Sequence, residues 1–219
     1  MTAAVLFDLD GVLLDSEPTW DEARRAFAAA HGGTWQPDAT ERMIGMSAPE
    51  WARYLHDELD VAEPPAAISA GVVELVLASY RDRLPLMPHA IEAVRALAEQ
   101  WPLGLASSSN RPVIDAALEA SGLRSCFAAV VSSEEVARGK PAPDVYLAVA
   151  AALHVEASEC IAVEDSANGI RSAHAAGART VAVPNRRFPP DPEVLALAAA
   201  VLDSVGELTP AAVTRVGAA

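Results

Sequence analysis

The sequence predicts an α/β fold with a doubly wound, mainly parallel sheet and an all-helical cap domain inserted after the first strand. Three observations predict it. Short apolar runs stopped by turn residues recur along the chain, helical patterns alternate with them after residue 85, and residues 15–85 contain helical patterns only. Because the apolar runs are continuous rather than alternating, we expect strands that are covered on both faces.

The strands are expected over five runs: 3–7, 103–106, 128–131, 161–163 and 180–183. The core helices are expected over 88–100, 112–121, 144–153 and 168–176, and the cap helices over 17–31, 48–59 and 68–83. The core domain then comprises residues 1–14 and 86–219, and the cap domain 15–85. A cap inserted at this point would lie over the C-terminal end of the first strand, where open α/β sheets bind ligands. The Ala-rich tail from about Leu195 fits either a final helix or a contact with a partner.

The composition restricts the possible partners. The formal net charge is −14 and no basic run offsets it, so we expect no nucleic-acid partner. No segment approaches the ~18 apolar residues of a membrane span, and the start MTAAVLFDLDG lacks the basic region of a signal peptide. Cys126 and Cys160 are expected to be unpaired, buried small side chains in a reducing cytoplasm. We therefore expect a cytoplasmic protein without a membrane partner, a monomer or weak homodimer.

Two aspartates end the first strand in the run FDLDG. Residues two apart in extended chain share a side, so Asp8 and Asp10 can face one ligand, and Gly11 lets the backbone approach it. Neighbouring carboxylates repel each other unless a cation or a shared proton intervenes. One aspartate could be a metal-bound nucleophile and the other an acid/base, although the run alone also fits a Ca²⁺ loop or an Asp-rich turn.

Two further signals follow later strands. Ser107, in the run LASSSN, could hold a phosphoryl oxygen together with turn N–H groups, although Ser-rich turns are common without a ligand. Lys140, in the run GKPAP, is the one lysine beside fifteen arginines. A solvated surface position is the alternative for Lys140, but a rigidly placed ammonium suits charge neutralisation at a transferring phosphoryl group.

A second acidic pair, Glu164 and Asp165, ends the fourth strand in the run AVEDSANG. Adjacent acids at a strand end need a cation, unless one of them caps the following helix. The strength of these signals lies in the set, because each of them falls at the C-terminal end of an expected strand or in the loop after one.

In their order along the chain, these motifs resemble those of the haloacid dehalogenase-like hydrolase superfamily, and the resemblance spans essentially the whole chain. It implies a Rossmann-like core in which Asp8 attacks phosphorus. Asp10 would protonate the leaving group and then activate water. Ser107 matches the second motif, and Lys140 matches the third, which ties the nucleophile to the phosphate.

The resemblance also implies Mg²⁺, an ion that prefers oxygen ligands in near-octahedral geometry. The expected shell contains the carboxylates of Asp8 and Asp165 and the backbone carbonyl of Asp10. Glu164 would join it directly or through water, and the substrate phosphate would complete it.

Within the superfamily, the runs DSEPTW, LASSSN and AVEDSANGI are most similar to the branch of β-phosphoglucomutase-like proteins and sugar-phosphate phosphatases. The mutase pattern has cationic cap residues beside Gly45-Met46-Ser47, where this chain has Ile44 and Ala48, and a hinge histidine where it has Trp20. Family members that cleave phosphonates need a lysine in the cap, whereas the one lysine of this chain is Lys140. Dehalogenases lack the second aspartate, which this chain has as Asp10. We therefore expect a Mg-dependent phosphatase of a small phosphorylated metabolite, a sugar or polyol phosphate. A sugar phosphomutase is the alternative, and a non-catalytic phospholigand-binding protein is a remote one.

Further substrate contacts are expected near these motifs, at Gly11, Ser108 and Asn110 in the core and at Glu17, Trp20 and Gly45 in the cap. Trp20 and Trp51 fit the cap core as well as the wall of a substrate cavity. The five histidines show no metal-ligand pairing and are expected to have structural roles.

Overall fold

The computed structural model describes residues 2–44 and 46–218. Their strands form one parallel sheet in the order β3-β2-β1-β4-β5-β6. The strands are β1 (Ala4–Phe7), β2 (Leu103–Ser107), β3 (Phe127–Ser132), β4 (Cys160–Glu164), β5 (Arg179–Ala182) and β6 (Ala200–Val201). The order runs outward from β1 in both directions, which confirms the doubly wound α/β class.

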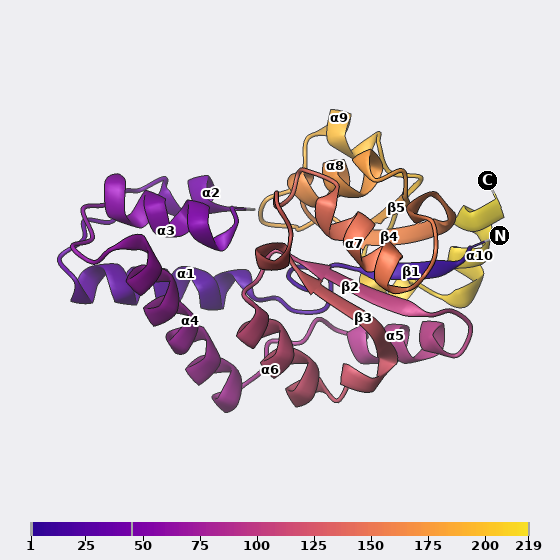
Figure 1. Ribbon diagram of the computed structural model, residues 1–219, viewed down its shortest axis with the longest axis horizontal. Coiled ribbons are helices and arrows are strands. Elements are labelled where there is room, and N and C mark those ends of the chain that lie inside the picture. Colours follow the sequence, from indigo (N-terminus) through magenta and orange to yellow (C-terminus); the bar gives the residue numbers. More distant parts are fainter. Residues whose placement is uncertain (1, 45, 219) are drawn as a thin grey trace.

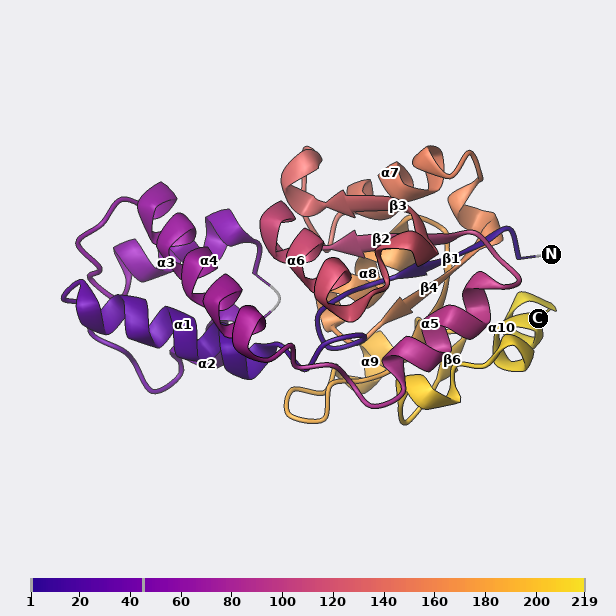
Figure 2. The same ribbon diagram turned by 90° about the horizontal axis from the view of Figure 1, so that it is seen from below.

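Helices cover both faces of this sheet (Figures 1 and 2). The helices are α5 (Ala90–Ala98) and α6 (Arg111–Ser121) on one face, and α7 (Asp144–Ala152) and α8 (Ala167–Ala175) on the other. Val5 and Phe7 of β1 belong to the larger hydrophobic cluster, which includes α5 and α6, whereas Ala4 and Leu6 belong to the cluster that includes α7. Because both faces of β1 are buried, its sequence is continuously apolar.

The cap consists of four helices, seen at the left of Figure 1: α1 (Glu17–Ala30), α2 (Ala39–Met43), α3 (Ala48–Asp57) and α4 (Pro65–Asp82). The short helix α2 was not predicted. The last cap helix begins three residues before its predicted start at Ile68, because a proline in the first turn needs no backbone N–H.

The two connections between cap and core run side by side. Leu14 and Leu86 form an isolated antiparallel bridge, and the Asp15 N–H donates to the Pro85 carbonyl at 2.8 Å. We propose the division predicted from the sequence, with residues 15–85 as the cap domain and 1–14 with 86–219 as the core domain.

The two cap tryptophans lie in the hydrophobic core. Trp20 and Trp51 are 4% and 3% exposed, and their ring centroids are 6.0 Å apart. The sequence left two positions open for these rings, the cap core and the wall of a substrate cavity. In the structure both rings lie in the cap core.

The tail packs against the core as a strand and helices. These elements are α9 (Pro192–Leu195), β6, a 3₁₀ turn at Val205–Glu207 and α10 (Pro210–Ala218). Short 3₁₀ turns elsewhere in the core span Arg124–Cys126, Ser133–Glu135 and Ala157–Glu159. Arg179 of β5 donates to the carbonyls of Val216 and Gly217 in α10. Of the two alternatives that the sequence left open for the tail, the structure has a final helix. Nothing in it tests a contact with a partner.

Two smaller expectations concern the whole chain. No helix in the described ranges is long and apolar enough to span a bilayer. Both cysteines are free, and Cys160 is buried as predicted, whereas Cys126 is only partly buried.

Candidate active site

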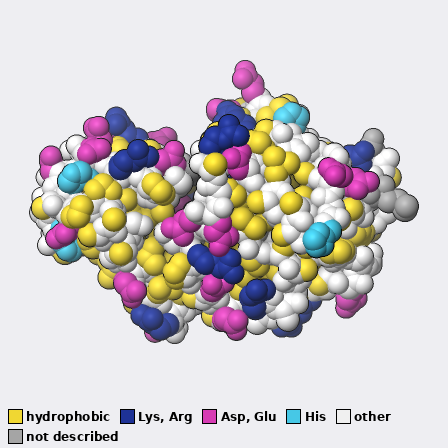
Figure 3. Space-filling view, viewed as in Figure 1, with side chains coloured by type: hydrophobic (Ala, Val, Ile, Leu, Met, Phe, Trp, Pro, Cys, Tyr) yellow, Lys and Arg dark blue, Asp and Glu magenta, His cyan; other side chains and the backbone are white. Residues whose placement is uncertain are grey.

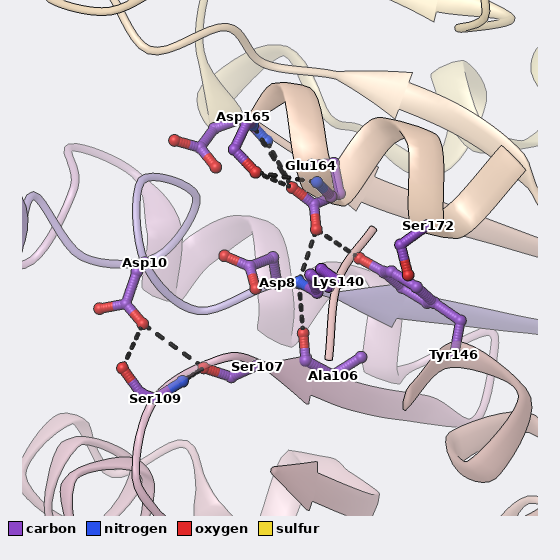
Figure 4. Close-up of polar contacts among 12 residues, drawn as sticks. Asp8, Asp10, Ala106, Ser107, Ser109, Lys140, Tyr146, Glu164, Asp165 and Ser172 are labelled. Atoms are coloured by element: carbon purple, nitrogen blue, oxygen red, sulfur yellow. Dashed lines mark hydrogen bonds and ion pairs between the residues drawn. The ribbon is translucent and has the colours of Figure 1, made fainter. Parts of the chain in front are cut away.

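The centre of the site is a buried ion pair at the C-terminal end of β1. Lys140, from the loop before α7, donates to Asp8 Oδ1 at 2.5 Å, to the Ala106 carbonyl at 3.0 Å and to Glu164 Oε1 at 2.6 Å (Figure 4). Asp8 and Lys140 are 5% and 7% exposed. Lys140 is therefore not a solvated surface residue. Three strand ends supply its acceptors, because β1 lies between β2 and β4 in the sheet.

Glu164 has donors on both of its carboxylate oxygens. Oε1 accepts from Lys140 and from the Tyr146 hydroxyl at 2.8 Å, and Oε2 accepts from the backbone N–H groups of Asp165 and Ser166 and from the Ser166 hydroxyl. The carboxylate also fills the place of a side chain at Gly169, where a Cβ would lie 1.9 Å from it. Glu164 is thus held rigidly at the start of α8, where the helix dipole favours an anion.

Asp165 faces the backbone turn that follows β1. Gly11 has φ of +83°, and a Cβ on it would lie 1.9 Å from Asp165 Oδ2. Only glycine combines this left-handed conformation with so close a carboxylate. The sequence predicted that the backbone at Gly11 approaches a ligand. In the structure it approaches the Asp165 carboxylate, and a ligand contact at Gly11 stays a prediction.

The cluster carries more negative than positive charge. Asp8, Glu164 and Asp165 bring carboxylate oxygens within 4.8 Å of one another. In the described chain one cation, Lys140, forms ion pairs with two of them, Asp8 and Glu164. Burial raises the pKa of Asp8 well above its usual range, and Lys140 only partly opposes this. Burial and then Glu164 raise the pKa of Asp165. The two nearby carboxylates raise the pKa of Lys140 although burial acts against them, so it stays charged.

One change would lower the raised pKa values of both Asp8 and Asp165. A second cation beside Asp8 and Asp165 would relieve their repulsion, and an all-oxygen donor set suits a hard divalent ion. The buried acidic cluster can therefore hold a metal ion.

Asp10 lies apart from this cluster, on the side of β2 (Figure 4). Its Oδ1 accepts from the Ser16 hydroxyl at 2.5 Å, and its Oδ2 accepts from Ser109 at 2.7 Å and more weakly from Ser107 at 3.4 Å. Ser16 stands just before α1, so the Asp10 carboxylate connects the core with the entry to the cap.

The serines at the end of β2 and directly after it have different positions. Ser107 is fully buried, and its hydroxyl accepts from the Ser109 N–H at 3.0 Å, whereas Ser108 lines the cavity above Asp8. Asn110 is buried at the start of α6 and donates to Glu134 at 2.7 Å. Neither Ser107 nor Asn110 is among the described cavity-lining residues, so their predicted phosphate or substrate contacts find no support here.

A cavity of about 270 Å³ opens onto these groups between cap and core. Figure 3 shows the surface notched between the cap lobe at the left and the core lobe at the right. The lining contains six acidic residues, and Lys140 is its one cation among the described residues; the acids are Asp8, Asp10, Asp15, Glu17, Asp165 and Asp191.

Of the two predicted cap contacts that the structure describes, Glu17 lines the cavity and Trp20 does not. Trp20 lies in the cap core instead, because its ring packs against Trp51. Gly45 lies outside the described residues, although its neighbour Ile44 lines the cavity.

The sequence reasoning missed three supporting residues. Tyr146 follows Lys140 by six positions on the buried face of α7, where its hydroxyl needs a polar partner. Ser109 stands two residues after Ser107, and nothing in the local sequence pairs it with Asp10. Arg24 occupies an apolar position of α1, a pattern that signals a buried ion pair.

Fold and site together define a capped α/β hydrolase. A family model described as haloacid dehalogenase-like hydrolase matches residues 2–177, and the chain belongs to this family. It is a phosphatase of the sugar-phosphate branch, as its curated relatives indicate.

One relative is hexitol phosphatase B of Escherichia coli (strain K12), 37% identical over 213 residues that cover 94% of each chain. Fructose-1-phosphate phosphatase YqaB of the same strain is 32% identical and covers 83% of this chain and 96% of its own. The crystal structure of CbbY from Rhodobacter sphaeroides in complex with phosphate superimposes with a TM-score of 0.87 at 30% identity, covering 98% of this chain and 100% of that one.

Proposed function

We propose that this phosphatase hydrolyses the phosphate monoester of a small sugar or polyol with Mg²⁺, through a phosphoryl ester on Asp8. The observation that carries the proposal is the meeting of Asp8, Asp10, Lys140 and Asp165 around one cavity. A carboxylate nucleophile, a second carboxylate for proton transfer and a buried ammonium are the groups that covalent phosphoryl transfer needs.

In the first step an Asp8 oxygen forms a bond to phosphorus, and the bond between phosphorus and the alcohol oxygen breaks. Asp10 gives a proton to that oxygen. In the second step Asp10 takes a proton from water, which attacks phosphorus and releases phosphate and free Asp8. The Ser16 and Ser109 hydroxyls each donate to one Asp10 oxygen. A carboxylate oxygen can accept a second hydrogen bond, so Asp10 can keep these partners while it serves the leaving group.

Lys140 keeps Asp8 oriented and adds positive charge beside the transferring group. Ser108 lines the cavity and is better placed for a phosphoryl contact than Ser107, which supports Asp10 through a weak hydrogen bond.

The carboxylates of Asp8 and Asp165 and the backbone carbonyl of Asp10 would hold Mg²⁺. Glu164 would act through water, because donors already occupy both of its oxygens. When bound, Mg²⁺ would neutralise charge on the phosphoryl oxygens.

The acidic cavity favours a monophosphate over a bisphosphate. A second phosphate would need a cation beyond Lys140 and Mg²⁺, and Ile44 occupies a lining position that is cationic in the mutase pattern. The names of the relatives, hexitol phosphatase and fructose-1-phosphate phosphatase, support a sugar or polyol phosphate.

A phosphate-release assay with Mg²⁺ over hexitol, hexose, 2-deoxyhexose and smaller polyol phosphates tests the proposal. Release that depends on Asp8 is the expected result. Isomerised phosphosugar in place of free phosphate would support the mutase, and binding without turnover would support the non-catalytic alternative. The cytoplasmic location and the monomeric or weakly dimeric state stay predictions.

A further inference from the structure

Two segments outside the catalytic cluster complete the cavity. Glu17 and Ile44 line it from the cap, and the loop after β5 contributes Phe188 and Asp191 among others. These segments bring no cation to the described lining. Their carboxylates repel a second phosphate but can accept hydrogen bonds from hydroxyl groups.

Glu17 is held by a buried cation of its own helix. Arg24 Nη1 donates to Glu17 Oε1 at 3.3 Å. The Arg24 guanidinium lies 5.4 Å from the ring centroids of both Trp20 and Trp51, and its side chain is 6% exposed. A buried guanidinium is costly without a partner, so the two rings and the carboxylate together determine where it can lie.

Beside this contact, the Glu17 carboxylate can accept further hydrogen bonds. No residue in the described part of the chain donates to its second oxygen, Oε2, and its side chain is 24% exposed, far more than that of Arg24. Burial raises the pKa of Glu17, and Arg24 is the first group that opposes this rise. The ion pair therefore favours an ionised acceptor at the cavity wall.

We propose that Arg24 is a positioning residue that aims the Glu17 carboxylate into the cavity, where its second oxygen accepts a hydrogen bond from a hydroxyl on the substrate's carbon chain. The inference rests on the proposed function and narrows the substrate class. The preferred substrates are monophosphates of hydroxyl-rich chains, over bisphosphates and over monoesters without hydroxyls. Trp20 and Trp51 act as the rigid support of the guanidinium.

Steady-state kinetics on two substrates test this role, with a hexitol 6-phosphate as the hydroxyl-rich ester and p-nitrophenyl phosphate as the ester without hydroxyls. Arg24→Met should raise KM for the hexitol phosphate by about tenfold, the value of one charged hydrogen bond, with a much smaller change in kcat. The rise in KM for p-nitrophenyl phosphate should be several times smaller. Arg24→Lys should restore part of the selectivity because it keeps the charge.

A double-mutant cycle separates positioning from general support of the cap. Glu17→Gln should reproduce the selective loss, and adding Arg24→Met to it should change the ratio of the two kcat/KM values by less than about twofold. The matched control is Arg25→Met, which removes an exposed arginine of the same helix that pairs with Asp21. This control should keep the wild-type ratio.

Equal losses on both substrates in Glu17→Gln, or independent losses in the double variant, would overturn the inference. Thermal unfolding shows whether each variant folds. If Arg24→Met fails to fold, the two single variants Glu17→Gln and Arg24→Lys decide the outcome. If the wild type hydrolysed p-nitrophenyl phosphate but no sugar or polyol phosphate, the proposed function itself would fail, and the inference with it.

Discussion

Lys140 and Arg24 are both buried cations beside carboxylates, but they are held in different ways. Lys140 has three acceptors, which come from the ends of β1, β2 and β4. Arg24 has one carboxylate and two indole faces, all from the cap, and its Nε has no partner among the described residues.

The difference follows from the architecture. Parallel strands end at one edge of a sheet, so several segments can saturate one ammonium and hold it rigidly. A guanidinium within a small helical cap has fewer polar neighbours, and its carboxylate partner keeps an oxygen for a ligand. We therefore assign the chemistry to the sheet and the choice of substrate to the cap, a division that the following changes can break.

The largest effect is expected for Asp8→Asn. The amide is a poor nucleophile, so kcat should fall by about 10⁴-fold or more, as for other covalent catalytic residues. The fold should remain, because the change removes one of several repelling buried carboxylates. Phosphate release measures the first effect and thermal unfolding the second. Turnover at the wild-type rate would remove Asp8 from the mechanism.

Removal of Mg²⁺ is expected to have the next largest effect. EDTA should lower phosphate release by about 10³-fold, because a metal ion supplies several kcal/mol of charge stabilisation. Restored Mg²⁺ should recover the activity. Mg²⁺ should also raise the thermal midpoint of the wild type by a few degrees, as binding only to the folded state requires, but not that of Asp165→Asn. Full activity in EDTA would contradict the metal assignment.

The effects of Lys140→Met, a substitution at the edge of the sheet, are compared with those of Arg24→Met, a substitution in the cap. We expect kcat to fall by about 10²- to 10³-fold on hydroxyl-rich and hydroxyl-free esters alike, because the ammonium acts at the phosphoryl group. Unpaired Asp8 and Glu164 should also lower stability, by about 3 kcal/mol. Rates should therefore be corrected for the folded fraction from circular dichroism. A change in KM alone would contradict the division between sheet and cap.

Tyr146→Phe is expected to have the smallest effect. It removes the hydroxyl that donates to Glu164 at 2.8 Å but keeps the ring, which lies 5.1 Å from Lys140 Nζ. The loss of one neutral donor should lower kcat by about fivefold and leave KM nearly unchanged. The control is Ser121→Ala at the C-terminal end of α6, where the hydroxyl bonds the Leu118 carbonyl and no other residue that the structure describes. An equal loss in both variants would show that Tyr146 has no specific role.

Much of the fold followed from local patterns. The continuous apolar runs identified β1 to β5, and a proline or glycine marked several helix ends, because backbone geometry limits where these residues fit. The two-residue strand β6 and the five-residue helix α2 were missed, since such short elements depend on their neighbours more than on their own sequence.

The positions of the candidate site were predictable only in part. Asp8, Lys140 and Asp165 could be assigned to one edge because each follows a strand of a parallel sheet. Trp20 could not be placed, because an apolar helix face shows that a residue is buried but not which surface covers it.

The sequence by itself determined which residue types end the central strands, and with them the acidic edge where a cation and a phosphate can meet. Only the tertiary structure decided which of these polar atoms are already paired. The reason is physical. Lys140 and Asp8 are 132 residues apart in the sequence, and Ser109 and Asp10 are 99 residues apart, yet each pair is hydrogen-bonded in the fold. Local spacing carries no record of such contacts. The Glu17 oxygen that no described residue bonds therefore became visible only in the folded chain.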